Sequence, residues 1–241
     1  MSASALILWD IDRTLVYVGE TDRLIYRQLV RDLLNTSAEH LPAKGTGRTV
    51  PLAVQELLQR NGARQEGLDA LVKQALAELP DRLWQQRGHM HEHGQLLAGA
   101  RQALRTVHAH PAWVASVVTG NLQRSAQIKL DTFGLADFVD TALGGYSSDD
   151  PHRPHLVGIA QQRAGTQHNA DFTRLNTVII GDSLEDVTTG REGGAQVLGV
   201  ASGTTTQAQL REAGADRVLP DLTDPQALTE ALTSLIGTPG N

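Results

Sequence analysis

Acidic side chains follow two short apolar runs of the chain, at the points where those runs end. Residues 5–9 lead directly into Asp10-Ile-Asp12-Arg-Thr14, and residues 177–181 lead into Asp182-Ser-Leu-Glu-Asp186. Carboxylates that converge on one point repel one another unless a cation lies between them, and Mg²⁺ prefers such hard oxygen ligands. If the two runs end side by side, the sequence therefore predicts a divalent metal site.

A third apolar run ends in a hydroxyl group and a flexible backbone. Residues 113–118 are followed by Thr119, Gly120 and Asn121. Hydroxyl and backbone N–H groups at a strand-to-helix turn are well suited to hold phosphoryl oxygens. Because Mg²⁺ usually completes its coordination with waters and substrate phosphate oxygens, these three residues and the acidic groups together predict a phosphorylated ligand.

The three runs belong to a larger set that reads as the strands of a parallel sheet. Each run is short, continuous and apolar, which is typical of strands buried on both faces. Stretches with helical spacing lie between them, at residues 99–108 and 125–133. This alternation predicts an α/β fold in which helices cover both faces of the sheet. The expected strands are residues 5–9, 113–119, 177–181, 196–200 and 217–219.

Between the first and second expected strands, residues 17–93 contain no strand-like run and follow helical periods. An apolar face repeats in steps of four from Ile25. Pro51 and Gly62 bracket a second helix, and a third apolar stripe precedes Pro80. We therefore expect an all-helical cap domain over residues 17–93, inserted into an α/β core of residues 1–16 and 94–241. The hinges are expected near Val16 and near His93.

His89, His91 and His93 alternate near the second hinge. On a strand they would share one face and could bind a metal, but no further ligand pattern accompanies them. We interpret them as part of a histidine-rich hinge.

Composition excludes several classes of function. The chain has 241 residues, 40% of them hydrophobic and 20% charged, with a net charge of -6 and no cysteine. The acidic balance argues against a nucleic-acid partner, and the lack of cysteine excludes disulfides and thiolate metal sites. The N-terminal apolar run is too short for a signal peptide or membrane span, so we expect a cytoplasmic protein without membrane contact, as a monomer or homodimer.

Taken together, the motifs resemble those of the haloacid dehalogenase-like (HAD) hydrolases. In that family the first motif reads Asp-x-Asp-x-Thr, the second ends a strand in Ser or Thr, the third is Lys or Arg, and the fourth contains paired acids. The match runs in order from Asp10 to Asp186, and the helical insertion resembles a type-1 cap. The resemblance implies a Rossmann-like core with this cap. The segments Leu96-Leu-Ala-Gly99, Thr119-Gly-Asn121 and Gly134-Leu135 are most similar to phosphoglycolate-phosphatase-like members.

The resemblance also implies a mechanism. Asp10 would attack phosphorus and form an aspartyl-phosphate, while Asp12 would protonate the leaving oxygen and later deprotonate the attacking water. The Mg²⁺ ligands would be the Asp10 carboxylate, the backbone carbonyl of Asp12, Asp182, and Asp186 either directly or through water. Thr119, Gly120 and Asn121 would hold the phosphoryl group, and Thr14 would support the loop.

Two positions depart from the family pattern. Many relatives have a Lys-Pro pair where this chain reads His152-Arg153-Pro154, so the basic role passes to Arg153, with Lys129 as its rival and a further candidate for phosphate binding. Arginine can hold a phosphoryl group bidentately. Arg13 stands where many relatives have glycine, and it either reaches toward an anionic substrate or faces solvent. In the cap, Arg48 and the loops near Val18 and Gly45 are candidate specificity elements.

The sequence favours a Mg²⁺-dependent phosphatase acting on a small phosphorylated metabolite, and three alternatives stay open. A phosphomutase of the same fold would use the same core residues and pass the phosphoryl group to a sugar. A dehalogenase would need neither Asp12 nor Asp182, so their presence counts against it. A catalytically silent binding module is the third alternative, because Arg13 and the missing Lys-Pro pair depart from the family pattern.

Overall fold

A six-stranded parallel sheet forms the centre of the protein. The computed structural model describes residues 5–43 and 47–236, so the predicted role of Gly45 lies outside the described residues. The strand order is β5-β4-β1-β6-β7-β8, with every neighbouring pair parallel. The bounds are β1 (Ala5–Trp9), β4 (Trp113–Thr119), β5 (Gly145–Tyr146), β6 (Thr177–Gly181), β7 (Gln196–Val200) and β8 (Arg217–Leu219).

These strands confirm the predicted α/β sheet, with all five expected strands at the expected positions. The sequence did not predict β5, because its two residues follow Gly144 and are too short to show an apolar pattern. Strand β5 pairs only with the last residues of β4, at the edge of the sheet.

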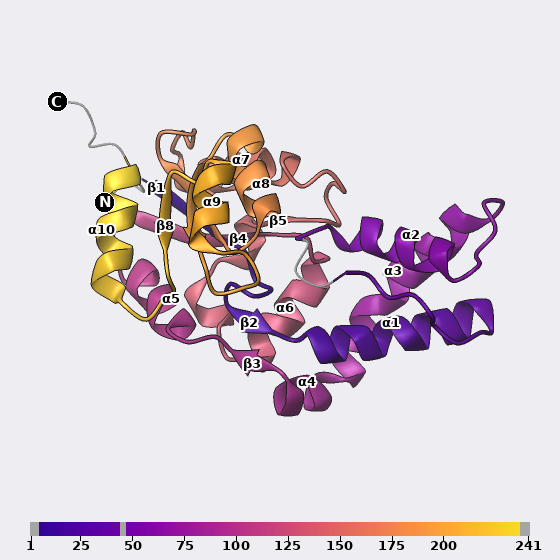
Figure 1. Cartoon of the computed structure of the whole chain (residues 1–241). Coiled ribbons are helices and arrows are strands. Elements are labelled where there is room, and N and C mark those ends of the chain that lie inside the picture. Colours follow the sequence, from indigo (N-terminus) through magenta and orange to yellow (C-terminus); the bar gives the residue numbers. More distant parts are fainter. Residues whose placement is uncertain (1–4, 44–46, 237–241) are drawn as a thin grey trace.

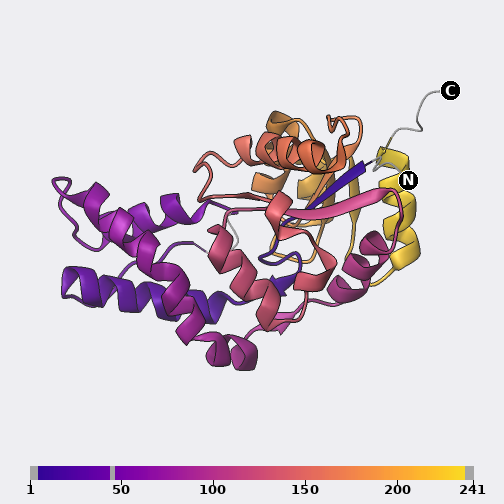
Figure 2. The ribbon, with the colours of Figure 1, turned by 180° about the vertical axis from the view of Figure 1, so that it is seen from behind.

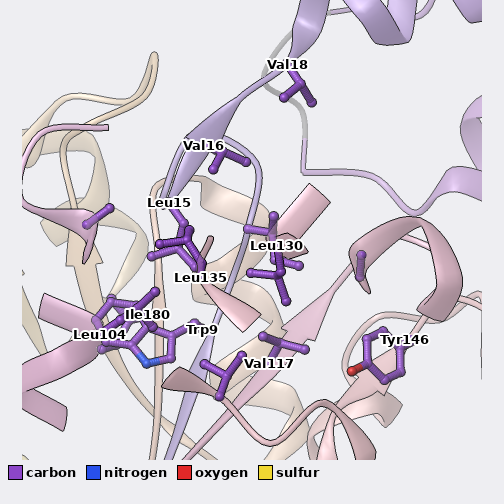
Figure 3. Close-up of a cluster of buried hydrophobic side chains, with 14 of the residues drawn as sticks. Trp9, Leu15, Val16, Val18, Leu104, Val117, Leu130, Leu135, Tyr146 and Ile180 are labelled. Carbon is purple, nitrogen blue, oxygen red and sulfur yellow. The ribbon is translucent and has the colours of Figure 1, made fainter. Parts of the chain in front are cut away.

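Helices cover both faces of the sheet (Figures 1 and 2). Along β1 the side chains alternate: Ile7 and Trp9 pack into one hydrophobic cluster, and Leu6 and Leu8 pack into the other. Figure 3 shows Trp9 inside the first cluster. That cluster includes α5 (Ala100–His108), α6 (Gln123–Thr132) and α10 (Pro225–Leu235), and the second includes α7 (His155–His168), α8 (Leu184–Gly193) and α9 (Gln207–Ala213).

The remaining helices form a group that extends away from the sheet (Figure 1). They lie in the chain between β2 (Val16–Tyr17) and β3 (Gln95–Leu96), which pair in antiparallel register. We propose that this group is the cap domain and that the β2/β3 ribbon connects it to the core. Tyr17 belongs to a strand, so the expectation that residues 17–93 contain none is wrong at that residue. The helices are α1 (Gly19–Leu34), α2 (Val50–Arg60), α3 (Leu68–Gln85) and α4 (Arg87–His93).

Two details of the cap differ from simple sequence reasoning. Helix α3 continues through Pro80, because Leu79, Pro80 and Leu83 are all buried and their packing outweighs the roughly 3 kcal/mol cost of an internal proline. The alternating histidines lie on helix α4 and so cannot share one face as they would on a strand. His89 and His93 are one turn apart, with ring centroids separated by 4.3 Å.

Among residues 5–43 and 47–236, no helix combines the length and the apolar character needed to cross a membrane.

Candidate active site

The three motif-bearing strands are neighbours in the sheet. Strand β1 lies between β4 and β6, so Asp10 after β1, Thr119 at the end of β4 and Asp182 after β6 lie at the same edge of the sheet. The chain passes from β1 to β4 on one side and later returns to β6 on the other. Ligands of open α/β sheets bind at such a reversal, beyond the carboxyl ends of the strands.

Three buried carboxylates converge at this edge. Asp10, Asp182 and Asp186 each present one oxygen, and these oxygens all lie within 4.8 Å of one another. One oxygen of Asp182, Oδ2, is buried and has no hydrogen-bond partner among the described residues. A buried carboxylate oxygen without a partner is costly, and a cation would supply one. The cluster therefore fits the divalent metal that the sequence predicts.

Burial and repulsion from neighbouring carboxylates raise the pKa values of Asp10 and Asp182. Burial raises the pKa of Asp182 to about 7, with the Asp186 carboxylate adding to the rise and the Thr14 hydroxyl opposing it. Burial raises the pKa of Asp10 well above its usual range; the carboxylate of Asp186 adds to this, and the guanidinium of Arg153 opposes it. A bound cation would favour the ionised forms of both groups.

Arg153 lies inside the carboxylate cluster. Its Nη2 donates to Oδ1 of Asp10 at 2.6 Å and to Oδ1 of Asp186 at 2.5 Å, and its side chain is buried. The other oxygen of Asp186 accepts from the backbone N–H of Ser183 at 2.9 Å, as part of the capping box that begins α8. Both oxygens of Asp186 are thus held in place before any ligand arrives.

Lys129, the rival basic residue, contacts a different carboxylate. From α6 its Nζ donates to both oxygens of Asp12, at 2.8 and 2.9 Å, and to Asp22 of the cap at 3.3 Å. Asn121 Nδ2 also donates to Asp12, at 2.7 Å. The structure therefore brings both candidate cations to the site. Arg153 contacts Asp10, and Lys129 contacts Asp12.

Residues 47–50 of the cap segment lie directly on the loop that follows β4. The backbone N–H of Val50 donates to the carbonyl of Gly120 at 2.8 Å, and the Thr49 hydroxyl donates to the carbonyl of Pro151 at 3.0 Å. Gly120 has room only for hydrogen, since a Cβ there would lie 2.9 Å from the Arg48 carbonyl oxygen. Residues 49 and 50 of the cap segment therefore contact the core beside the strand ends.

These contacts enclose a cavity of about 170 Å³ between the core motifs and the cap. Arg13 and Arg48, the two predicted specificity residues, both line it. Arg13 has a left-handed backbone with φ 68°, and its guanidinium lies 4.8 Å from the centre of the Tyr17 ring. Arg48 forms an ion pair with Glu56 on α2.

Sequence reasoning missed several residues of the site or gave them smaller roles. The Thr14 hydroxyl lies 3.4 Å from Asp10 Oδ2 and 3.3 Å from Asp182 Oδ1, so it contacts the carboxylates as well as supporting the loop. At Gly203, a Cβ would lie 1.7 Å from Asp182 Oδ2, and no local pattern indicated this approach. In the cap, Asp22 and Arg23 line the cavity from the first turns of α1, where their polar character could have suggested a role.

Comparison with known proteins agrees with this geometry. Residues 7–191 match the family model of the haloacid dehalogenase-like hydrolases. The chain belongs to this family. The resemblance inferred from the ordered motifs is therefore confirmed at the level of the family, and this HAD protein is expected to share the hydrolase chemistry of its relatives.

Individual relatives are distant in sequence but cover nearly the whole chain. "Probable phosphatase IndB" from Dickeya dadantii (strain 3937) is 23% identical to this HAD protein over 237 residues, covering 96% of this chain and 92% of its own. A hydrolase from Pseudomonas syringae has a similar fold, with a TM-score of 0.65 at 20% identity, covering 97% of this chain and 99% of its own. A Lactobacillus plantarum protein whose name includes "phosphoglycolate phosphatase" has a TM-score of 0.64 at 16% identity, covering 95% and 100%.

Proposed function

We propose that the protein is a Mg²⁺-dependent phosphatase that hydrolyses a small phosphorylated metabolite through an aspartyl-phosphate. The observation that carries this proposal is the buried group of Asp10, Asp182 and Asp186, in which Asp182 Oδ2 has no partner among the described residues. The phosphate-binding candidates Thr119 and Asn121 lie at the end of the neighbouring strand β4 and in the loop after it. Membership of a hydrolase family and likeness to a protein named as a phosphatase support the same activity.

Asp10 is the nucleophile in this proposal. One carboxylate oxygen attacks phosphorus, the bond between phosphorus and the leaving oxygen breaks, and the phosphoryl group becomes attached to Asp10. Arg153 holds Oδ1 of Asp10 at 2.6 Å and so fixes the orientation of the carboxylate before attack. Attack by an anion on a phosphate dianion is electrostatically opposed, and the Arg153 guanidinium offsets part of that charge.

Asp12 is the proton-transfer group. It gives a proton to the leaving oxygen in the first step and takes a proton from water in the second, when water releases phosphate from Asp10. Lys129 and Asn121 donate to its carboxylate at 2.7 to 2.9 Å, which fixes its position. Lys129 is thus a positioning residue for Asp12, and the basic residue of the third motif is Arg153.

The carboxylates of Asp10 and Asp182 and the backbone carbonyl of Asp12 would hold Mg²⁺, with Asp186 direct or through water. When bound, the ion would neutralise charge on the phosphoryl oxygens. Both oxygens of Asp186 accept hydrogen bonds, from Arg153 and from Ser183, so Asp186 would mainly hold Arg153 in position.

The test is hydrolysis of p-nitrophenyl phosphate by the purified protein, with and without EDTA. We expect turnover with Mg²⁺, loss of turnover in EDTA, and recovery when Mg²⁺ is restored. Asp10→Asn should abolish turnover, because an amide is a poor nucleophile toward phosphorus. Asp137→Asn is the matched control, since Asp137 is exposed and does not line the cavity, and it should retain wild-type turnover.

Two results would contradict the proposal. Turnover that persists in EDTA would remove the metal from the mechanism, and turnover by Asp10→Asn would remove the nucleophile. Phosphoryl transfer to an added sugar hydroxyl that is faster than transfer to water would select a phosphomutase instead.

A further inference from the structure

Two arginine side chains that line the cavity have no hydrogen bond or ion pair with the residues that the structure describes. They are Arg13, in the loop after β1, and Arg23, on the first turns of α1. The other basic groups of the cavity differ, since Lys129, Arg48 and Arg153 each contact carboxylates. Two guanidinium groups that line the cavity therefore form no ion pair with the described residues, although the charge of Arg13 helps to lower the pKa of Asp182.

Arg23 belongs to the face of α1 that looks into the cavity. Gly19, Asp22, Arg23 and Tyr26 all line it, and their spacing of three and four residues places them on one side of the helix. Arg23 is half-buried, so its charge is partly removed from water, and no described carboxylate forms an ion pair with it. An anion in the cavity would compensate this cost.

Arg13 is held in the cavity by its own loop. Its backbone adopts φ 68°, a region that side-chain-bearing residues seldom enter, and its carbonyl accepts from the Ser202 hydroxyl at 2.7 Å. The guanidinium lies over the Tyr17 ring, with Cζ 4.8 Å from the centroid. The N–H groups of the guanidinium make no hydrogen bond to the residues that the structure describes, and their arrangement matches the geometry of a carboxylate or phosphate.

We propose that Arg13 and Arg23 form a second anion site, which binds a carboxylate or a second phosphate group on the organic part of the substrate. The proposal rests on the phosphatase function proposed above and narrows its substrate to phosphomonoesters with a second anionic group. Arg13 comes from the core loop and Arg23 from the cap, so one such group would contact both parts of the closed enzyme. A substrate without the group would leave both guanidiniums unpaired.

The test compares substrates that differ only in the second anion. Phosphoglycolate is matched with ethyl phosphate, and propane-1,3-diol bisphosphate with propyl phosphate. In the wild type, we expect kcat/KM to be at least tenfold higher for the member of one pair that carries the second anionic group, and the pair that responds identifies the anion as carboxylate or phosphate. Arg23→Met and Arg13→Gly should each reduce this ratio at least fivefold, mainly through KM. Glycine at position 13 also suits the left-handed backbone.

Arg27→Met is the matched control, because Arg27 lies one turn further along α1, is exposed and does not line the cavity. It should leave the ratio unchanged. A wild-type ratio near one in both pairs, or a ratio that survives both substitutions, overturns the anion site, while turnover of p-nitrophenyl phosphate keeps the phosphatase. Failure to hydrolyse any phosphate ester rejects the phosphatase, and the anion site with it.

Discussion

At the scale of single residues, the site separates two tasks that both need a positive charge. Arg153 contacts the proposed nucleophile Asp10, and Lys129 contacts the proposed proton-transfer group Asp12. Each cation is buried and fixed by more than one carboxylate, so neither can readily replace the other. Removal of Arg153 leaves the buried carboxylates of Asp10 and Asp186 without their shared partner, which is more costly than the pairing itself.

We therefore predict that Arg153→Met lowers kcat for p-nitrophenyl phosphate by about a hundredfold or more, corresponding to a loss of about 3 kcal/mol of transition-state stabilisation. Arg153→Lys should recover part of this loss, because an ammonium keeps the charge but not the two-pronged geometry. Arg211→Met on α9, an exposed arginine far along the chain from the motifs, serves as the control. If Arg153→Met kept more than a tenth of the wild-type kcat, another residue would have to stabilise the transition state.

At the scale of elements, the first turn of helix α8 contributes both to the stability of the helix and to the active site. Ser183 and Asp186 form a capping box, and the same Asp186 carboxylate accepts from Arg153. Helix α9 begins with an equivalent box made by Thr206 and Gln209, away from the carboxylates. The two helices therefore offer a comparison in which the local contribution of the cap is similar and only one cap holds a site residue.

Ser183→Ala and Thr206→Ala should each lower the free energy of unfolding by about 1 kcal/mol, the usual effect of losing an N-cap. Only Ser183→Ala should also lower kcat, because it removes the 2.6 Å hydrogen bond to Asp186 Oδ2. Urea unfolding and turnover of p-nitrophenyl phosphate measure the two effects. Equal losses of kcat in both variants would mean that the activity follows stability alone.

The strands could be predicted from the sequence, but the contacts between distant segments could not. Strands such as β1 and β6 were predictable because continuous apolar runs need burial on both faces, and their order in the chain was enough to expect Asp10 and Asp182 at one edge. Contacts made across long separations were not predictable. Gly203 approaches Asp182 and Lys129 contacts Asp12 only because distant segments fold together, and no local pattern encodes either meeting.

At the scale of the whole molecule, the buried carboxylates link folding to metal and pH. Without metal, burial holds the pKa of Asp182 at about 7, above its value in an unfolded chain near about 4. Between these values the folded protein binds more protons than the unfolded one. Stability therefore falls as pH rises through this window, because the slope of the unfolding free energy follows the difference in bound protons.

In EDTA, we predict that the wild type loses more unfolding free energy between pH 5 and pH 8 than Asp182→Asn, in which this group cannot ionise. Urea denaturation at the two pH values measures the difference. Excess Mg²⁺ should reduce the decline in the wild type, since a bound cation stabilises the ionised carboxylates. The same decline in both proteins would show that Asp182 does not contribute.

The contact between the cap and the β4 loop is made by main-chain atoms, the Val50 amide and the Gly120 carbonyl. A seal of this kind does not depend on the identity of the side chain at position 50, provided that it is not proline. Substitutions at position 50 that change the wall of the cavity would therefore keep this hydrogen bond between the cap and the β4 loop. The shape of the pocket wall at position 50 and the contact that covers the strand ends can therefore change independently.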